Sequence, residues 1–191
     1  MMMKQLSPLR QILLFTTSLA AAGAVALHAH AQALLPQSKI NITFKQMGVS
    51  VDAAFNKFNA TIQYDPKQPA AAKANFTIEI NSFDLGSPDY NKEVLKPEWF
   101  DAPKFPTATF VSSSMKAISP GQLEATGKLT IKGKSQDITF PVAVKETGET
   151  RNFEGTVRIK RLTFDIGTGE WKDTSMVADE VMIKVLASTK K

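Results

Sequence analysis

The side chains that most often act as nucleophiles or bind transition metals are almost absent from this 191-residue chain. It contains no cysteine, and its only two histidines are His28 and His30. Catalysis by Ser-His-Asp or Cys-His, and the usual zinc and copper sites, need these residues. Beyond residue 30, acid–base or nucleophilic chemistry would have to come from carboxylates, lysine or tyrosine.

Carboxylates are the strongest remaining candidates, because several of them surround one predicted connection between strands. Two carboxylates that converge in a cleft can serve as a general acid and a general base. Acids in a helical connection, however, usually form a solvated face. We therefore expect a protein that is not an enzyme and that holds no metal ion and no cofactor. The acids in question are Asp84, Asp89, Glu93, Glu98 and Asp101.

The N-terminal segment has the pattern of a secretory signal. Lys4 and Arg10 precede an apolar run over 12–27, and the small residues of "AHAQA" follow. This pattern predicts a signal peptide over residues 1–33, cleaved after Ala31 or Ala33, and export to the periplasm. The alternative is an uncleaved anchor, but the run is shorter than the roughly 20 apolar residues that span a bilayer.

Residues 34–191 are expected to form one domain with a substantial core. The formal net charge of the chain is only +5, and its basic residues are scattered. Nucleic acid is therefore not an expected partner.

Alternation of apolar and polar residues dominates the predicted domain, and it is typical of half-buried strands. Turn sequences rich in Pro, Gly and polar residues separate these segments, so antiparallel pairing is expected. Two longer gaps predict short helices: one over 45–58, beginning near Ser50 or Asp52, and one over 87–100, with Ser87 as N-cap and Pro97 as its end. The predicted strands cover residues 39–44, 59–64, 75–81, 107–115, 123–131, 137–145, 152–160 and 180–187.

Eight antiparallel strands can form a sandwich or a barrel. Gly127 and Gly155 interrupt two strand patterns, where a strongly bent sheet has no room for a side chain. We therefore predict an all-β fold: an eight-stranded antiparallel β-barrel with one or two short helices.

The interior of such a barrel is either filled by its own side chains or holds one small ligand. Core packing explains any single apolar residue, but the number of phenylalanines and methionines favours an adaptable apolar cavity. Trp99, Phe100 and Phe105 are expected to cover one opening of the barrel. The predicted cavity-lining residues are Phe44, Met47, Phe55, Phe58, Ile78, Ile80, Phe83, Leu95, Trp99, Phe100, Phe105, Phe110, Leu129, Phe140 and Phe153.

From about residue 38 to its end, the chain resembles the YceI family of secreted bacterial proteins. The resemblance rests on "FNATIQYDP", "FTIEINSFDLG", "LKPEWFDAPKFPTATFVSSSM", "ATGKLTIKGKSQDITFPVAV" and "VADEVMIKV". It implies a lipocalin-like barrel that binds polyisoprenoids. The expected function is non-catalytic storage or transport of a long-chain isoprenoid, such as a prenyl phosphate or an isoprenoid quinone, or of a similar lipid.

The chain departs from the family pattern at two places where members often carry histidine. Residues 46–48 read Gln-Met-Gly instead of His-Leu-Gly, and residues 91–95 read "NKEVL" instead of Arg-Asp-x-His-Leu. A ligand head group would meet Lys92 and Lys96 there. The alternative hypothesis is a filled-core interaction or stress-adaptation module that partners a membrane redox protein. The volume of the interior discriminates between the lipid carrier and the filled-core module. Under either hypothesis, transient membrane contact and homodimerisation both stay open.

Overall fold

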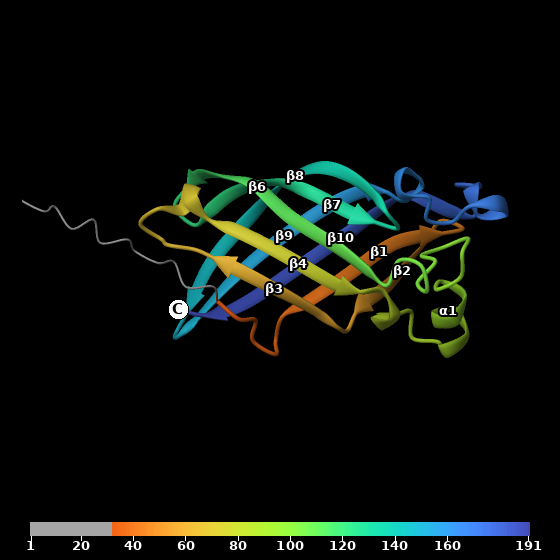
Figure 1. Ribbon diagram of the computed structural model, residues 1–191, viewed down its shortest axis with the longest axis horizontal. Coiled ribbons are helices and arrows are strands. Elements are labelled where there is room, and N and C mark those ends of the chain that lie inside the picture. Colours follow the sequence, from red (N-terminus) through yellow and green to blue (C-terminus); the bar gives the residue numbers. More distant parts are fainter. Residues whose placement is uncertain (1–31) are drawn as a thin grey trace, which may run out of the picture.

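The computed structural model describes residues 32–191, so most of the predicted signal segment and both histidines lie outside the described residues. One antiparallel sheet makes up nearly the whole domain (Figure 1). A short helix, α1 (Pro88–Glu93), lies at the opposite end of the molecule from the C-terminus. The strands are β1 (Lys39–Gln46), β2 (Val49–Phe55), β3 (Phe58–Gln63), β4 (Lys73–Glu79), β5 (Phe83–Asp84), β6 (Thr107–Ser119), β7 (Gln122–Ile131), β8 (Lys134–Thr147), β9 (Thr150–Lys160) and β10 (Val177–Lys190).

The strands follow the order β3-β4-β6-β7-β8-β9-β10-β1-β2-β5 across the sheet. Most neighbours are also consecutive in sequence, but β1 pairs with β10, for example Lys39 with Leu186. The sheet curls around an apolar interior (Figure 1). The predicted antiparallel, lipocalin-like all-β fold is confirmed, with ten strands instead of eight.

The predicted helix over 45–58 is wrong, because this segment contains a hairpin of β1 and β2. Met47 (φ 49°) and Gly48 (φ 81°) both adopt the left-handed conformation, which makes a tight two-residue turn. The turn pairs Gln46 with Val49 and continues the alternation of apolar residues into β2. The other additional strand, β5, has only two residues and pairs with β2.

The second predicted helix is present but ends earlier than expected. Helix α1 begins at Pro88, directly after Ser87, and the side chain of Ser87 makes no capping hydrogen bond. The chain then turns several times before β6. The ammonium group of Lys132, in the turn between β7 and β8, holds this connection: it donates to the carbonyl oxygens of Pro97 (2.6 Å) and Asp165 (2.8 Å).

Gly127 allows the sheet to bend sharply at β7. A Cβ atom at this position would lie 2.6 Å from the ring of Phe110 and 2.5 Å from the carbonyl oxygen of Val111. Without a side chain at Gly127, the ring of Phe110 crosses over β7 and meets Phe140, with the ring centroids 5.5 Å apart. This glycine therefore determines how aromatic rings are placed in the interior.

A short N-terminal segment, residues 32–35, connects two strands that do not pair with each other. The backbone N–H of Gln32 donates to the carbonyl oxygen of Ile62 in β3 (2.9 Å). The backbone N–H of Leu35 donates to the carbonyl oxygen of Ser188 in β10 (2.7 Å). We call residues 32–35 the N-terminal bridge, because they join the edge strand β3 to the middle of the sheet.

Candidate functional site: an apolar cavity with one polar end

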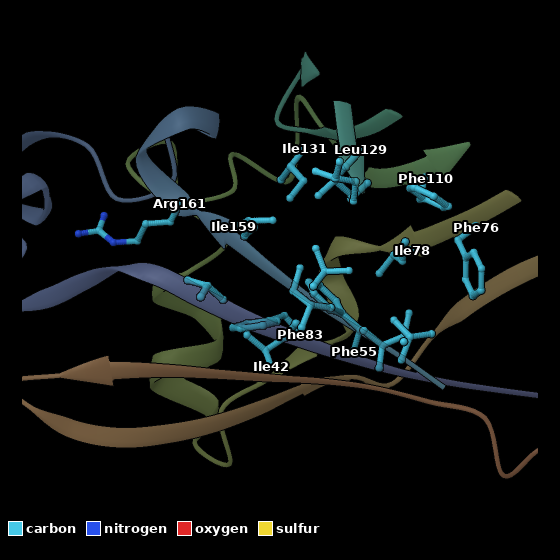
Figure 2. A pocket seen from close by; sticks show the side chains of 18 of the residues that line it. Ile42, Phe55, Phe76, Ile78, Phe83, Phe110, Leu129, Ile131, Ile159 and Arg161 are labelled. Atoms are coloured by element: carbon cyan, nitrogen blue, oxygen red, sulfur yellow. The ribbon is translucent and has the colours of Figure 1, made fainter. Parts of the chain in front are cut away.

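A cavity of about 470 Å³ runs through the interior of the curled sheet. Its wall consists of alternate residues of the strands, whose intervening residues face outward. On β7, for example, Leu123, Ala125, Leu129 and Ile131 all line the cavity. Figure 2 shows the apolar side chains converging from several strands. The polar or charged side chains on the wall are Gln46, Lys73, Tyr90, Glu93 and Arg161, together with the two tryptophans Trp99 and Trp171.

Aromatic rings pack against one another in the half of the cavity near α1. Phe83 lies between Phe55 and Phe100, with ring centroids 4.8 Å and 5.3 Å away. These contacts are tilted or edge-to-face, the arrangements that aromatic pairs prefer. The half near the C-terminus is lined by a smaller group that includes Ile62, Ala74, Phe153 and Ala187.

Most of the residues predicted from the sequence to line a cavity do border this one. These are Phe44, Phe55, Ile78, Ile80, Phe83, Trp99, Phe100, Phe110, Leu129, Phe140 and Phe153. These residues either face inward from a strand or lie in the connections beside α1.

Four predicted residues do not border the cavity. Met47 occupies the β1–β2 turn, where 75% of its surface is exposed. Phe105 lies against Gly133 in the turn between β7 and β8. Phe58, at the start of the edge strand β3, and Leu95, just after α1, pack against the core cluster from outside the cavity wall.

Arg161 is the main feature that the sequence prediction missed. It lies at one end of the group of apolar side chains, and its own side chain extends away from them (Figure 2). The residue is only 3% exposed, and within the described part of the chain no carboxylate lies close enough to form an ion pair with it. Burial lowers the pKa of its guanidinium group. All its hydrogen bonds go to backbone carbonyl oxygens, those of Ile166, Gly167, Trp171, Val177 and Ala178, at 2.7–3.1 Å.

The sequence did contain a signal for Arg161. Every second residue of β9 faces inward and lines the cavity, and Arg161 is the next residue in this alternation. The inward-facing residues are Phe153, Gly155, Val157 and Ile159. A positively charged residue at a position that faces the apolar interior is unusual, because arginine is seldom buried without a compensating partner.

Trp99 connects Arg161 to the cavity. The guanidinium carbon of Arg161 lies 5.9 Å from the centroid of the Trp99 ring, and the ring of Trp171 lies 5.2 Å from the same ring. Trp99 lines the cavity. Its indole Nε1 is buried and has no hydrogen-bond partner among the described residues.

The lysines expected to meet a head group lie elsewhere. Lys92 and Lys96 are both exposed, and neither borders the cavity. Lys96 is paired with Glu93, and this hydrogen bond raises the pKa of Lys96. The cations that do border the cavity are the buried Arg161 and the exposed Lys73.

The acids considered for catalysis have structural roles where contacts are seen. Asp84 accepts hydrogen bonds from the side-chain amide of Asn91 (3.0 Å) and from the backbone N–H of Gly86 (2.8 Å). These two bonds, that of Asn91 first, hold the pKa of Asp84 below its usual value. Glu93 is paired with Lys96. The described residues contain no group of three or more acidic side chains arranged to hold a metal ion.

A curled antiparallel sheet around an elongated apolar cavity defines a lipocalin-like β-barrel fold, and the cavity has one polar end. The chain belongs to the YceI family: the model of the YceI-like domain matches residues 34–188. Protein YceI of Salmonella arizonae is 31% identical over 163 residues, which cover 82% of this chain and 83% of that protein. No helix in the described part of the chain is long and apolar enough to cross a membrane.

Solved structures show the same fold. BcnA of Burkholderia cenocepacia is 48% identical and superimposes with a TM-score of 0.78, covering 80% of this chain and 96% of that one. A domain from Saccharophagus degradans, described as polyisoprenoid-binding and implicated in plant cell wall breakdown, has a TM-score of 0.68 at 14% identity. It covers 84% of this chain and 98% of its own, and at that identity it shows the fold alone.

Proposed function

We propose that this protein is a non-catalytic carrier that holds a long-chain isoprenoid, such as a prenyl phosphate or an isoprenoid quinone, or a similar lipid, for storage or transport. The observation that carries the proposal is the cavity of about 470 Å³ with an almost wholly hydrocarbon wall. This volume falls within the range of pockets that bind small molecules. A filled-core interaction module would not need such a cavity, so the cavity favours the carrier.

A long hydrocarbon chain suits this wall energetically. Each buried CH₂ group contributes roughly 0.8 kcal/mol, so many weak contacts add up without any specific polar bond. Phenylalanine rings and short aliphatic side chains from almost every strand supply these contacts. Chain length and shape are therefore the expected basis of selection. Family membership supports the same assignment, as does the fold shared with the Saccharophagus domain.

We further propose that the protein acts in the periplasm after removal of its signal peptide. Of the two predicted cleavage positions, the one after Ala31 is favoured, because it keeps Gln32 and its hydrogen bond to Ile62. Cleavage after Ala33 would remove this half of the N-terminal bridge. N-terminal sequencing of the exported protein distinguishes the two positions.

The test of the carrier function is to purify the protein, extract it with organic solvent and identify bound lipid by mass spectrometry. Titration with an isoprenoid quinone and with a prenyl phosphate follows. Absence of both co-purified lipid and binding would contradict the proposal.

A matched pair of variants on β6 connects binding to the cavity. Ala108 is buried and lines the cavity, whereas Val111, on the same strand, is 51% exposed. Ala108→Trp should fill the cavity and reduce affinity at least tenfold, and Val111→Trp should leave affinity unchanged. Equal binding by the two variants would show that the ligand lies outside the cavity.

A further inference from the structure

We propose that the protein exchanges its ligand at a lipid bilayer, which it contacts with three exposed apolar side chains at the α1 end of the barrel. These side chains belong to Met47, Val49 and Met176, and we call them the apolar tip. The inference rests on the proposed carrier function and adds to it the surface through which a membrane lipid enters and leaves the cavity.

The apolar tip is contiguous, because the segments that form it are paired with one another. Gln46 pairs with Val49 in β2 and with Val177 in β10. The backbone N–H of Met47 donates to the carbonyl oxygen of Met176 (2.8 Å). Met47 is 75% exposed, Val49 67% and Met176 44%. Single exposed apolar residues are common on protein surfaces, whereas a contiguous group of them is often functional.

The tip adjoins the wall of the cavity where the cavity reaches the surface. Met47 directly follows Gln46, Met176 directly precedes Val177, and both Gln46 and Val177 line the cavity. Gln46 is exposed, and so is Tyr90 of α1, another residue of the wall. The β1–β2 turn and α1 lie at the same end of the molecule (Figure 1). An isoprenoid that leaves a bilayer at this opening passes into the cavity without crossing water.

The size of the tip favours a bilayer over a protein partner. Three partly exposed side chains present an apolar area on the order of a few hundred Å², whereas a standard protein interface buries about 800 Å² on each partner. The tip is therefore too small to hold a second copy of this chain in a stable dimer. Methionine side chains are also flexible, so they adapt to a surface that has no fixed shape.

The charges around the tip are nearly balanced. The flanking segments 45–50, 88–93 and 170–176 carry three lysines and four acids. Such a surface has no net attraction for anionic lipids, so apolar contact has to drive binding, and salt should not weaken it. The charged residues are Lys45, Lys92 and Lys172, and Asp89, Glu93, Glu170 and Asp173.

The opposite end of the barrel lacks such a surface. The exposed residue of the cavity wall there is Lys73, a cation next to the edge strand. The β6–β7 turn lies at this end (Figure 1), and beside it Ile118 is 57% exposed. Neither chain neighbour of Ile118 lines the cavity. Exposed apolar surface and an opening of the cavity therefore coincide at the α1 end.

Cosedimentation with phosphatidylcholine vesicles tests the contact. The double variant Met47→Asn/Met176→Ser should bind the vesicles about three- to tenfold more weakly than the wild type. Asparagine tolerates the left-handed conformation of residue 47 (φ 49°), so the turn is retained. Val111→Thr/Ile118→Thr, which removes two exposed apolar side chains from β6, should bind like the wild type. Adding phosphatidylglycerol to the vesicles should change binding by less than about twofold.

A second measurement follows the transfer of geranylgeraniol from vesicles to the protein. The tip variant should accept it about three- to tenfold more slowly than the wild type, because its opening no longer rests on the bilayer. The affinity for geranylgeraniol in the absence of vesicles should match that of the wild type, because the tip residues do not line the cavity. This unchanged affinity also shows that the tip variant is folded.

Several results would overturn the inference. If the wild type does not bind the vesicles, or the tip variant binds them equally well, the carrier function stands and the membrane contact does not. Binding that requires phosphatidylglycerol and disappears at high salt would show an electrostatic contact instead. Dimerisation that only the tip variant loses would assign the tip to a second copy of the chain. If the wild type binds vesicles through the tip but never binds geranylgeraniol, the membrane contact stands and the carrier function fails.

Discussion

A buried arginine lies near each end of strand β9, and the two are held by different partners. Arg151, at its start, donates twice to one carboxylate oxygen of Glu146 (2.8 and 2.9 Å) and lies 4.9 Å from the Tyr64 ring. Arg161, just past its end, lies over Trp99 and binds only backbone carbonyls. Both cations face an aromatic ring, but only Arg151 has an anionic partner. Arg151 therefore shares the carboxylate of Glu146 with Lys191, whereas the charge of Asp179 acts on Arg161 without forming an ion pair.

Replacing the two arginines in turn should give the largest difference between the ends. Arg161→Met leaves several buried carbonyl oxygens without a donor and should lower the free energy of unfolding by about 3–5 kcal/mol. Arg151→Met should cost about 1–2 kcal/mol, because its partner Glu146 is half-exposed and can be hydrated. Urea denaturation measures both values. Equal losses would contradict the different roles assigned to the two residues.

Two glycines near Arg161 allow a second comparison, in which the expected loss of stability is smaller. Gly167 has φ +78°, and a Cβ there would lie 2.2 Å from Nη1 of Arg161. Gly169 has φ +64°, and a Cβ there would meet nothing within 4 Å. Gly167→Ala should therefore cost about 2–4 kcal/mol, and Gly169→Ala only the backbone strain of about 1 kcal/mol. If thermal unfolding finds the two variants equally stable, Arg161 is not confined as the structure indicates.

The smallest expected effect is a dependence of stability on pH, which arises at the end of the barrel that contains Arg151. Hydrogen bonds from Lys191 and then from Arg151 hold the pKa of Glu146 below its ordinary value of 4.5. A lowered pKa in the folded state means that the contribution of Glu146 is complete above about pH 4.5 and is lost as the pH falls through the folded-state pKa. The carbonyl partners of Arg161 do not titrate in this range.

Comparison of wild type with Glu146→Gln tests this difference between the ends. The wild type should be more stable at pH 7, and the difference should shrink as the pH falls below 4.5. Urea unfolding at pH 7 and at a pH below 4.5 measures this difference in stability. A difference that stays constant with pH would show that the charge of Glu146 is irrelevant to stability.

Much of the fold could be predicted because alternation of apolar and polar residues is typical of a half-buried strand. All eight predicted strands are present, and most of their inward residues line the cavity. Strand β2 was missed because Met47 is not a residue type that marks a left-handed turn, although Gly48 beside it is. The sequence pattern therefore predicts a helix for the segment "VSVDAAF".

Alternation along a strand indicates which residues lie on the cavity wall, whereas apolar character alone does not. Phe110 and Phe140 were correctly placed facing the interior by their alternation. Met47 and Phe105 are apolar, but both lie at or beside hairpin turns and not on the cavity wall. Arg161 was overlooked because a cation suggests the surface, although its position continues the inward face of β9. Its five carbonyl partners lie in the segment that follows and in β10, and sequence spacing does not reveal such contacts.

The pairing of β1 with β10 has a consequence for how the chain folds. Lys39 is aligned with Leu186, and the N-terminal bridge also contacts β10, through Ser188. Contacts between residues so far apart in sequence carry a large loop-closure entropy and slow folding. The hairpins from β6 to β9 can form as soon as they emerge, but the interior cannot be enclosed until the last fourteen-residue strand is available. Until then, the same hydrocarbon surface that lines the cavity is exposed to water and prone to aggregate, so the C-terminal strand completes the fold.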